Sequence, residues 1–188
     1  MSGALDPGNF RRVMGLFATG VTVVANQTGQ EIHAMTANAV TSLSLDPLLV
    51  LVCIAKRAHM AELLVEGVGF SINILRGEQQ ALSNYFSGRW DRKPPPFRFV
   101  PWQGRPRLEG CLASLGCTCY QTVDGGDHWI VIGRVVALHQ GIEPFQPLLF
   151  FKGQYSQLTL SEGEPAPDLG WVETPVLVYY DPWNYEQE

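Results

Sequence analysis

A short stretch rich in hydroxyl side chains is the first place in this sequence where a ligand could bind. Between Met35 and Pro47, five small polar residues fall within nine positions, namely Thr36, Asn38, Thr41, Ser42 and Ser44. An apolar run from Leu48 to Ile54 follows, and a short run behind Asp-Pro predicts a fully buried strand. Such a strand, fed by small polar residues, can present backbone amides and hydroxyls to a phosphate or a ring. The alternative is an ordinary hairpin turn whose hydroxyls cap backbone groups, and such turns are common.

One histidine is the best candidate for a catalytic group. His128 lies in Gly126-Asp127-His128-Trp129, between an expected turn and an apolar strand expected at residues 129–138. A histidine at the rim of a barrel can reach a ligand held in the mouth. The alternative is a turn histidine that is hydrogen-bonded to Asp127.

Other common catalytic and cofactor motifs are missing from the sequence. It contains no glycine-rich dinucleotide or phosphate loop after a strand, and no Gly-x-Ser-x-Gly elbow. Cys111, Cys117 and Cys119 share one face of an expected strand, but no second pair of cysteines or histidines stands at zinc spacing. We therefore interpret these cysteines as buried apolar side chains and expect no metal.

The elements that must position these residues are mostly short strands. Alternating or continuous apolar runs predict strands at residues 21–25, 31–35, 48–54, 70–75, 111–120, 129–138 and 147–151. Short helices are expected after the capping pair Asp6-Pro7 and at residues 58–66 and 77–86. Residues 87–107 read as an ordered surface loop. Because long alternation of strand and helix is absent, the pattern predicts an antiparallel barrel or sandwich.

Composition and charge exclude some partners. The length of 188 residues suits one domain, or one domain with an extension. The net charge is -5 with no cluster of Lys and Arg, which argues against nucleic acid as a partner. The first residues lack the basic and apolar regions of a signal peptide, and the longest apolar run is too short to span a bilayer. We expect a cytoplasmic protein with no membrane partner.

Several segments together point to one known family. They keep a common order and spacing, and they are Phe17–Val24, Met35–Cys53, Phe70–Leu75, Gln79–Ser83, Gly126–His128, Ile132–Val135 and Pro147–Tyr155. Over residues 9–158 the chain resembles the flavin reductase-like, FMN-binding split-barrel family, the small reductase components of two-component flavin-dependent monooxygenases. Residues 159–188 extend beyond the part that carries the resemblance.

The resemblance implies both a fold and a function. The fold would be mainly β, a six-stranded Greek-key split β-barrel with short flanking helices that forms a homodimer. Residues 1–158 would be the flavin reductase-like domain and residues 159–188 a C-terminal extension. The function would be that of an NAD(P)H:flavin oxidoreductase, which passes a hydride from NADH or NADPH to FMN or FAD and supplies reduced flavin to a separate monooxygenase. The alternative is a flavin-binding electron-transfer protein on the same barrel without reductase turnover.

The same resemblance implies three groups of site residues. A cradle for the flavin ring and ribityl chain would consist of Thr36, Ala37, Asn38, Ala39, Val40, Ser42 and Leu43. The phosphate end would be approached by Ala55, Lys56, Arg57, His59 and Arg89. The family usually carries small hydroxyl residues just after the apolar strand, where this chain has Lys56 and Arg57, which would substitute by charge. The nicotinamide nucleotide would be oriented by His128, with Phe150, Phe151, Lys152, Gly153 and Tyr155 facing it.

Overall fold

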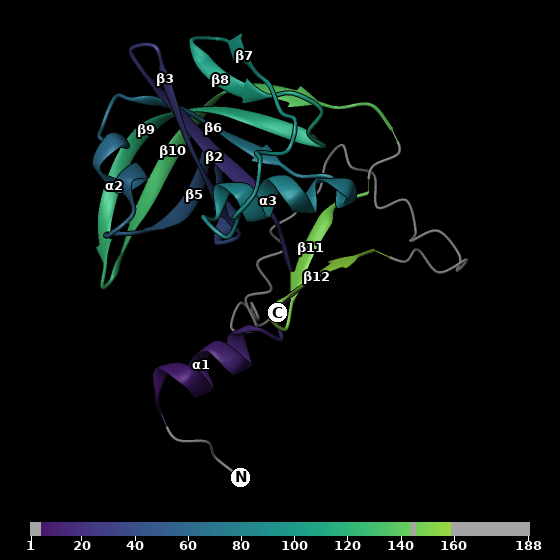
Figure 1. The fold of residues 1–188 in the computed structure, drawn as a ribbon. Coiled ribbons are helices and arrows are strands. Elements are labelled where there is room, and N and C mark those ends of the chain that lie inside the picture. The colour runs from purple at the N-terminus through teal and green to yellow at the C-terminus, as the bar shows by residue number, and fades with distance from the viewer. Residues whose placement is uncertain (1–4, 144–145, 159–188) are drawn as a thin grey trace, which may run out of the picture. The chain divides into compact units, whose positions relative to one another are not determined.

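The chain folds into antiparallel sheets with a few short helices (Figure 1). The computed structural model describes residues 5–143 and 146–158, so the expected extension at 159–188 lies outside the described residues. The largest sheet has seven strands, in the order β3 (Glu31–Ala37), β2 (Thr22–Thr28), β6 (Gly69–Ile74), β9 (Ala113–Gly125), β10 (His128–Gln140), β5 (Leu48–Ala55) and β4 (Val40–Leu45). The mainly β class predicted from the sequence is confirmed.

Two smaller sheets and four helical segments make up the rest of the secondary structure of the described residues. The second sheet joins β1 (Thr19–Gly20), β11 (Leu148–Phe151) and β12 (Gln154–Gln157), and the third is a hairpin of β7 (Phe99–Trp102) and β8 (Arg105–Leu108). The helical segments are α1 (Pro7–Met14), α2 (His59–Leu63), the 3-10 turn η1 (Gly77–Gln79) and α3 (Gln80–Phe86). Within the described residues, no helix has the length and apolar content that a membrane span requires.

The hydroxyl-rich stretch is mostly strand, where the sequence predicted a turn. β3 runs to Ala37 and β4 begins at Val40, so only Asn38 and Ala39 connect them. β4 pairs with β5, with a register shift between Ser42 and Ser44. Of the small polar residues, Thr41, Ser42 and Ser44 lie on the edge strand β4, Thr36 lies on β3, and Asn38 lies in the connection, which is two residues long.

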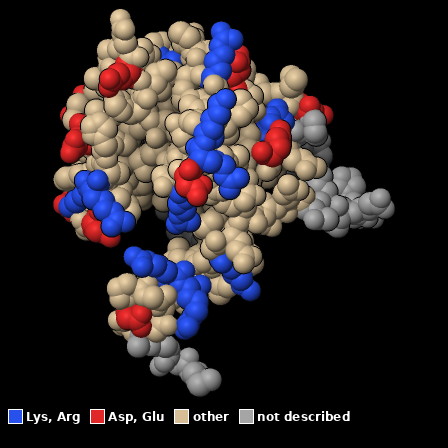
Figure 2. All heavy atoms as spheres, viewed as in Figure 1, with Lys and Arg blue, Asp and Glu red and all other residues tan. Residues whose placement is uncertain are grey.

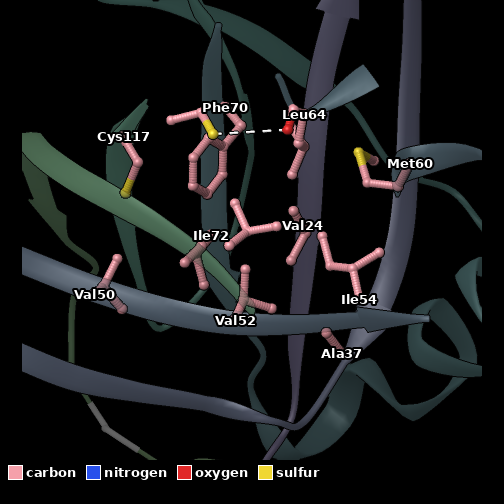
Figure 3. Close-up of a cluster of buried hydrophobic side chains, with 12 residues drawn as sticks. Val24, Ala37, Val50, Val52, Ile54, Met60, Leu64, Phe70, Ile72 and Cys117 are labelled. Carbon is pink, nitrogen blue, oxygen red and sulfur yellow. Dashed lines mark hydrogen bonds between the residues drawn. The ribbon is translucent and has the colours of Figure 1, made fainter. Parts of the chain in front are cut away.

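β5 is buried on one face only, although its apolar run predicted burial on both. Val50, Val52 and Ile54 are buried, while the residues between them are half-buried. Figure 3 shows these three side chains in the main core with Phe70 and Ile72 of β6. The apolar residues on the other face of β5 line cavities instead of a second packed layer.

β6 carries polar side chains in the interior of the protein. The sequence assigned it one polar face, and that face, formed by Ser71 and Asn73, is fully buried. The covering element is the β7–β8 hairpin, since the Ser71 hydroxyl donates to the Pro106 carbonyl and Asn73 Oδ1 accepts from the Leu108 N–H. The expectation that residues 87–107 form a surface loop is therefore wrong for 99–102 and 105–107, which belong to this hairpin.

α1 is capped as the Asp-Pro pair predicted, but it buries none of its residues. The Asp6 carboxylate accepts hydrogen bonds from the N–H groups of Gly8 and Asn9, at 2.8 and 3.0 Å. At the other end, the C-cap Gly15 accepts a 2.7 Å hydrogen bond from the Lys152 N–H, which ties α1 to the β11–β12 turn (Figure 1). The apolar side chains of α1 remain open, with Phe10 67% exposed.

Candidate functional site

A cavity of about 590 Å³ lies between α1 and the strands and gathers many of the predicted site residues. The predicted residues among its lining are Asn38, Ala39, Val40, Phe150 and Gly153. α1 adds Phe10 and Met14, and the half-buried face of β5 adds Leu51 and Cys53. A largely apolar cavity of this volume falls in the usual range for small-molecule sites. It therefore has room for a planar ring system.

Two hydrogen bonds fix the connection between β3 and β4 at this cavity. The Cys53 N–H donates to the Ala39 carbonyl at 3.0 Å, and Asn38 Nδ2 donates to Thr19 Oγ1 at 3.2 Å. The connection is thereby held against β5 on one side and β1 on the other. A ligand in the cavity meets a positioned wall instead of a free loop.

A second, smaller cavity of about 170 Å³ adjoins the first through Asn38 and Phe150, which line both. Its other lining residues are Val21, Thr36, Ser83, Ser87, Arg89 and Tyr155. Its lining is more polar than that of the larger cavity, because four side chains contribute hydroxyl groups and one contributes a guanidinium. That set of donors suits a phosphate or the hydroxyls of a polyol chain.

Hydrogen bonds hold the polar groups of the smaller cavity in place. The Thr36 hydroxyl donates to the Ser83 carbonyl at 2.7 Å, and the Ser83 and Tyr155 hydroxyls lie 2.8 Å apart. The Tyr155 hydroxyl also donates to Asn84 Oδ1 at 3.1 Å. Sequence reasoning missed Ser83 and Ser87 as site residues. Ser83 lies in the Gln79–Ser83 motif, which was a signal for it, whereas nothing in the sequence singled out Ser87.

The residues just after β5 do not reach the small cavity. Lys56 Nζ pairs with Asp124 Oδ2 at 2.6 Å and sits 4.6 Å from the centre of the Trp129 ring. The hydrogen bond from Lys56 is the main reason that the pKa of Asp124 is lowered. Arg57 is exposed, and Ala55 lies opposite His128 in the β5–β10 pairing. Of the five residues expected at the phosphate end, Arg89 alone lines this cavity.

His59 faces a third hollow instead. Its Nδ1 lies 3.2 Å from Glu62, and its ring meets that of His33 edge-on with centroids 5.0 Å apart. Both rings line a hollow of about 790 Å³ that also includes Tyr85, Phe86 and other aromatic side chains. Gly88, which lines this hollow, stands in the chain between Ser87 and Arg89, which line the small cavity.

His128 is held at the start of β10 by the contact that its sequence context suggested. Its Nδ1 lies 2.7 Å from Asp127 Oδ1, and its side chain is 43% exposed. The hydrogen bond with His128, and then its charge, lowers the pKa of Asp127, and the guanidinium of Arg11 acts in the same direction. His128 itself does not line the 590 Å³ cavity, but Arg11 does, so the pair stands near its α1 side.

The remaining predicted residues divide between strand faces and the β11–β12 turn. Ala37 is buried, and its carbonyl accepts from the Thr22 hydroxyl at 2.7 Å. Ser42 lines an apolar hollow of about 560 Å³ beside β4 and β5, and Leu43 is 38% exposed. Lys152 has a left-handed backbone, with φ of 51°, and stands in the turn between Phe151 and Gly153.

The cysteines have the properties of apolar core residues. Burial raises the pKa of the Cys111 and Cys117 thiols to about 12, so both stay protonated at neutral pH. A protonated thiol is a poor metal ligand and a poor nucleophile. In the part of the chain that the structure describes, no three His, Cys, Asp or Glu side chains are grouped to hold a metal ion.

Comparison with known proteins identifies similar chains. The sequence family described as "Flavin reductase like domain" matches residues 14–159. An NADH-dependent flavin reductase from Rhodococcus sp is 40% identical over 166 residues, covering 85% of this chain and 93% of the relative. The reductase subunit HsaB of a flavin-dependent monooxygenase from Rhodococcus jostii (strain RHA1) is 36% identical over 168 residues, covering 87% and 84%.

A solved structure agrees with the sequence comparisons. The flavin reductase PheA2 in its native state superposes with a TM-score of 0.78 at 40% sequence identity, over 83% of this chain and all of that one. The residues that the family model matches include the whole lining of the small cavity, and the lining of the larger cavity except Phe10 and Arg11.

Proposed function

Because this chain belongs to the family of flavin reductase-like domains, we propose that it transfers a hydride from NADH to FMN or FAD and supplies the reduced flavin to a separate monooxygenase. The observation that carries the proposal is the meeting of the two cavities. A largely apolar space suited to a ring adjoins a small polar space lined by a guanidinium, and Asn38 and Phe150 line both. A flavin has this division of character, with a flat ring at one end and a phosphate at the other.

The residues present fit a flavin in one orientation. The connection at Asn38 and Ala39 would contact the ring, and Arg89 would pair with the phosphate. The Thr36 hydroxyl would reach the ribityl chain, and so would the Tyr155 hydroxyl, which the sequence had placed at the nicotinamide nucleotide but which lines the small cavity. Flavin, when bound, supplies the hydride-accepting chemistry itself. The protein has to position two reactants and keep water out, and holding reactants in a reactive geometry accounts for several kcal/mol of a barrier.

The nicotinamide would enter the 590 Å³ cavity from the side of α1. Phe10, Met14 and Phe150 give that side apolar surface, which would cover the two rings once they are bound. His128, fixed by Asp127, would orient the nicotinamide nucleotide at the rim. An electron-transfer protein that only binds flavin has no need for space beside the ring, so the open volume favours the reductase over that alternative.

The direct test is flavin-dependent oxidation of NADH by the purified chain. We expect the absorbance of NADH to fall when catalytic FMN or FAD is added, and to stay constant without flavin or without protein. Parallel titrations with both flavins and with NADPH give the preference for each reactant. If neither flavin supports loss of NADH or NADPH, the chain is not a reductase.

We further propose that the sheets form the six-stranded split barrel of the family and that two copies form a homodimer. The support for the homodimer is the large amount of apolar surface on neighbouring strands: Leu45 and Leu48 are 58% and 45% exposed, and Val136 and Leu138 are 51% and 69% exposed. Exposed apolar patches of this kind mark interaction sites. Sedimentation should give the mass of two chains, and Leu138→Glu should shift it to one.

The domain boundaries predicted from the sequence remain part of the proposal. Residues 1–158 would carry the reductase activity, and residues 159–188 would be a C-terminal extension. The cytoplasmic location also remains a prediction from the sequence.

A further inference from the structure

Three cationic side chains line a hollow of about 440 Å³ between α1 and the β11–β12 turn. They are Arg11 and Arg12 of α1 and Lys152 of the turn, and the other lining residues are Gly15, Leu16 and Gly153. Figure 2 shows Lys and Arg side chains gathered over α1 and next to it. The chain as a whole carries a net charge of -5, so this basic hollow is a local feature.

The backbone brings these cations together. The Lys152 N–H donates to the Gly15 carbonyl at 2.7 Å, so the last turn of α1 lies directly against the β11–β12 turn. Lys152 is one of two residues other than glycine with a left-handed backbone among those described. Lys152 and Gly153 both have positive φ, as two-residue hairpin turns require, and this fixes Lys152 at the tip of the β11–β12 turn.

None of the three cations forms a salt bridge within the described residues, whereas Lys56 and Arg98 each pair with an acidic side chain. Arg11 acts on Asp127 through its charge, which helps to lower the pKa of that carboxyl group. Lys152 Nζ lies 5.3 Å from the centre of the Phe151 ring, and Arg12 Nη2 donates to Asn9 Oδ1 at 2.7 Å. The basic hollow therefore offers an anion three cations, none of them in a salt bridge within the described residues.

The basic hollow adjoins the 590 Å³ cavity assigned to the reacting rings. Arg11, Gly15 and Gly153 line both. A ligand that places an apolar ring in the larger cavity and extends towards α1 reaches the cations next. A nicotinamide dinucleotide has this order, because its two linked phosphates follow the nicotinamide riboside.

We propose that the basic hollow binds the pyrophosphate of NADH, with Arg11 and Lys152 as the principal contacts. The inference rests on the proposed reductase function and adds to it a binding subsite formed by α1. Arginine pairs with phosphate oxygens through two parallel hydrogen bonds, and lysine supplies a mobile point charge. Arg89, in the small cavity, serves the phosphate of the flavin, so the two reactants use separate cations.

The test removes each charge and compares hydride donors with and without phosphates. Arg11→Ala and Lys152→Asn are the variants, and asparagine suits the second position because it tolerates the left-handed backbone. With flavin saturating, we expect each variant to raise KM for NADH about tenfold with kcat within about twofold. Turnover of 1-benzyl-1,4-dihydronicotinamide, which has no phosphate, should not change. Arg11→Lys and Lys152→Arg should recover most of the affinity.

A second ligand and two further variants complete the design. ADP-ribose keeps the pyrophosphate and lacks nicotinamide, so it should compete with NADH and lose about tenfold in affinity in the same variants. Arg98→Ala removes an exposed cation elsewhere and should leave both donors unaffected. Arg89→Ala should raise KM for FMN and leave KM for NADH nearly unchanged.

Several results would overturn the inference. An unchanged KM for NADH, or an equal loss with the phosphate-free donor, would remove the basic hollow from NADH binding. A rise in KM for FMN in place of NADH would assign the cations to flavin. Absence of flavin-dependent turnover of every donor by the wild-type chain would instead refute the reductase function itself.

Discussion

Replacing His128 by alanine should lower kcat/KM for NADH about 100-fold, while the affinity for flavin changes less than about twofold. The reason is the position of the imidazole. His128 is the first residue of β10, lies opposite Ala55, and is fixed by a 2.7 Å contact with Asp127. It lines neither the 590 Å³ cavity nor the small polar cavity. Its loss would disturb the alignment of the nicotinamide and leave the flavin contacts intact. Steady-state kinetics and fluorescence titration with FMN measure the two effects separately.

A matched variant separates orientation from charge. Asp127→Asn keeps a hydrogen-bonding partner for His128 but removes the negative charge, and it should cost less than the alanine substitution. If His128→Ala abolishes flavin binding, His128 is a flavin ligand or a structural residue, and its assigned role is wrong.

The second large effect concerns stability: Asn73→Ala should reduce the free energy of unfolding by about 4 kcal/mol. Asn73 is fully buried and makes four hydrogen bonds. Its Nδ2 donates to the Val23 carbonyl and the Ser71 hydroxyl, and its Oδ1 accepts from the Leu108 N–H and the Ser114 hydroxyl. The substitution would leave a buried backbone N–H and a buried carbonyl without these partners, far from water.

Urea denaturation measures this loss. Ser71→Ala is the control, because it removes a hydroxyl from the same network and should cost only about 1 to 2 kcal/mol. A loss below about 1 kcal/mol for Asn73→Ala would mean that water replaces the amide, and that the β7–β8 hairpin does not depend on it.

The sequence predicted most strands because their apolar residues make local patterns. It placed β2, β3, β5, β6 and the start of β11 within a few residues of their observed bounds. It missed β4 because small hydroxyl residues favour turns locally, and the pairing with β5 outweighs that preference. It missed the β7–β8 hairpin because Pro101 and Pro106 argue against strands. These prolines lie opposite each other in a two-stranded hairpin, where edge positions tolerate proline.

The candidate site was predictable where residues act through short-range motifs. Thr36, Asn38, Arg89, Phe150 and Tyr155 meet at one small cavity, although they come from three separate segments. Lys56 was expected there and is elsewhere, because its charge is taken by Asp124, which lies 68 positions away in the chain. Sequence spacing carries no information on such a distant pair. The contribution of α1 was missed for the same reason, since only the folded chain brings Gly15 to Lys152.

The attachment of α1 has a consequence for how this protein can vary its affinity. α1 buries none of its residues, yet it lines both the 590 Å³ cavity and the basic hollow. A linker of a few residues joins it to β1. Such a tether keeps a weakly docked segment at an effective concentration in the millimolar range. Changes in the length or stiffness of the linker would therefore alter residence times of the dinucleotide without altering any group that contacts the flavin. Exchange of the dinucleotide is then separable from the contacts that hold the flavin.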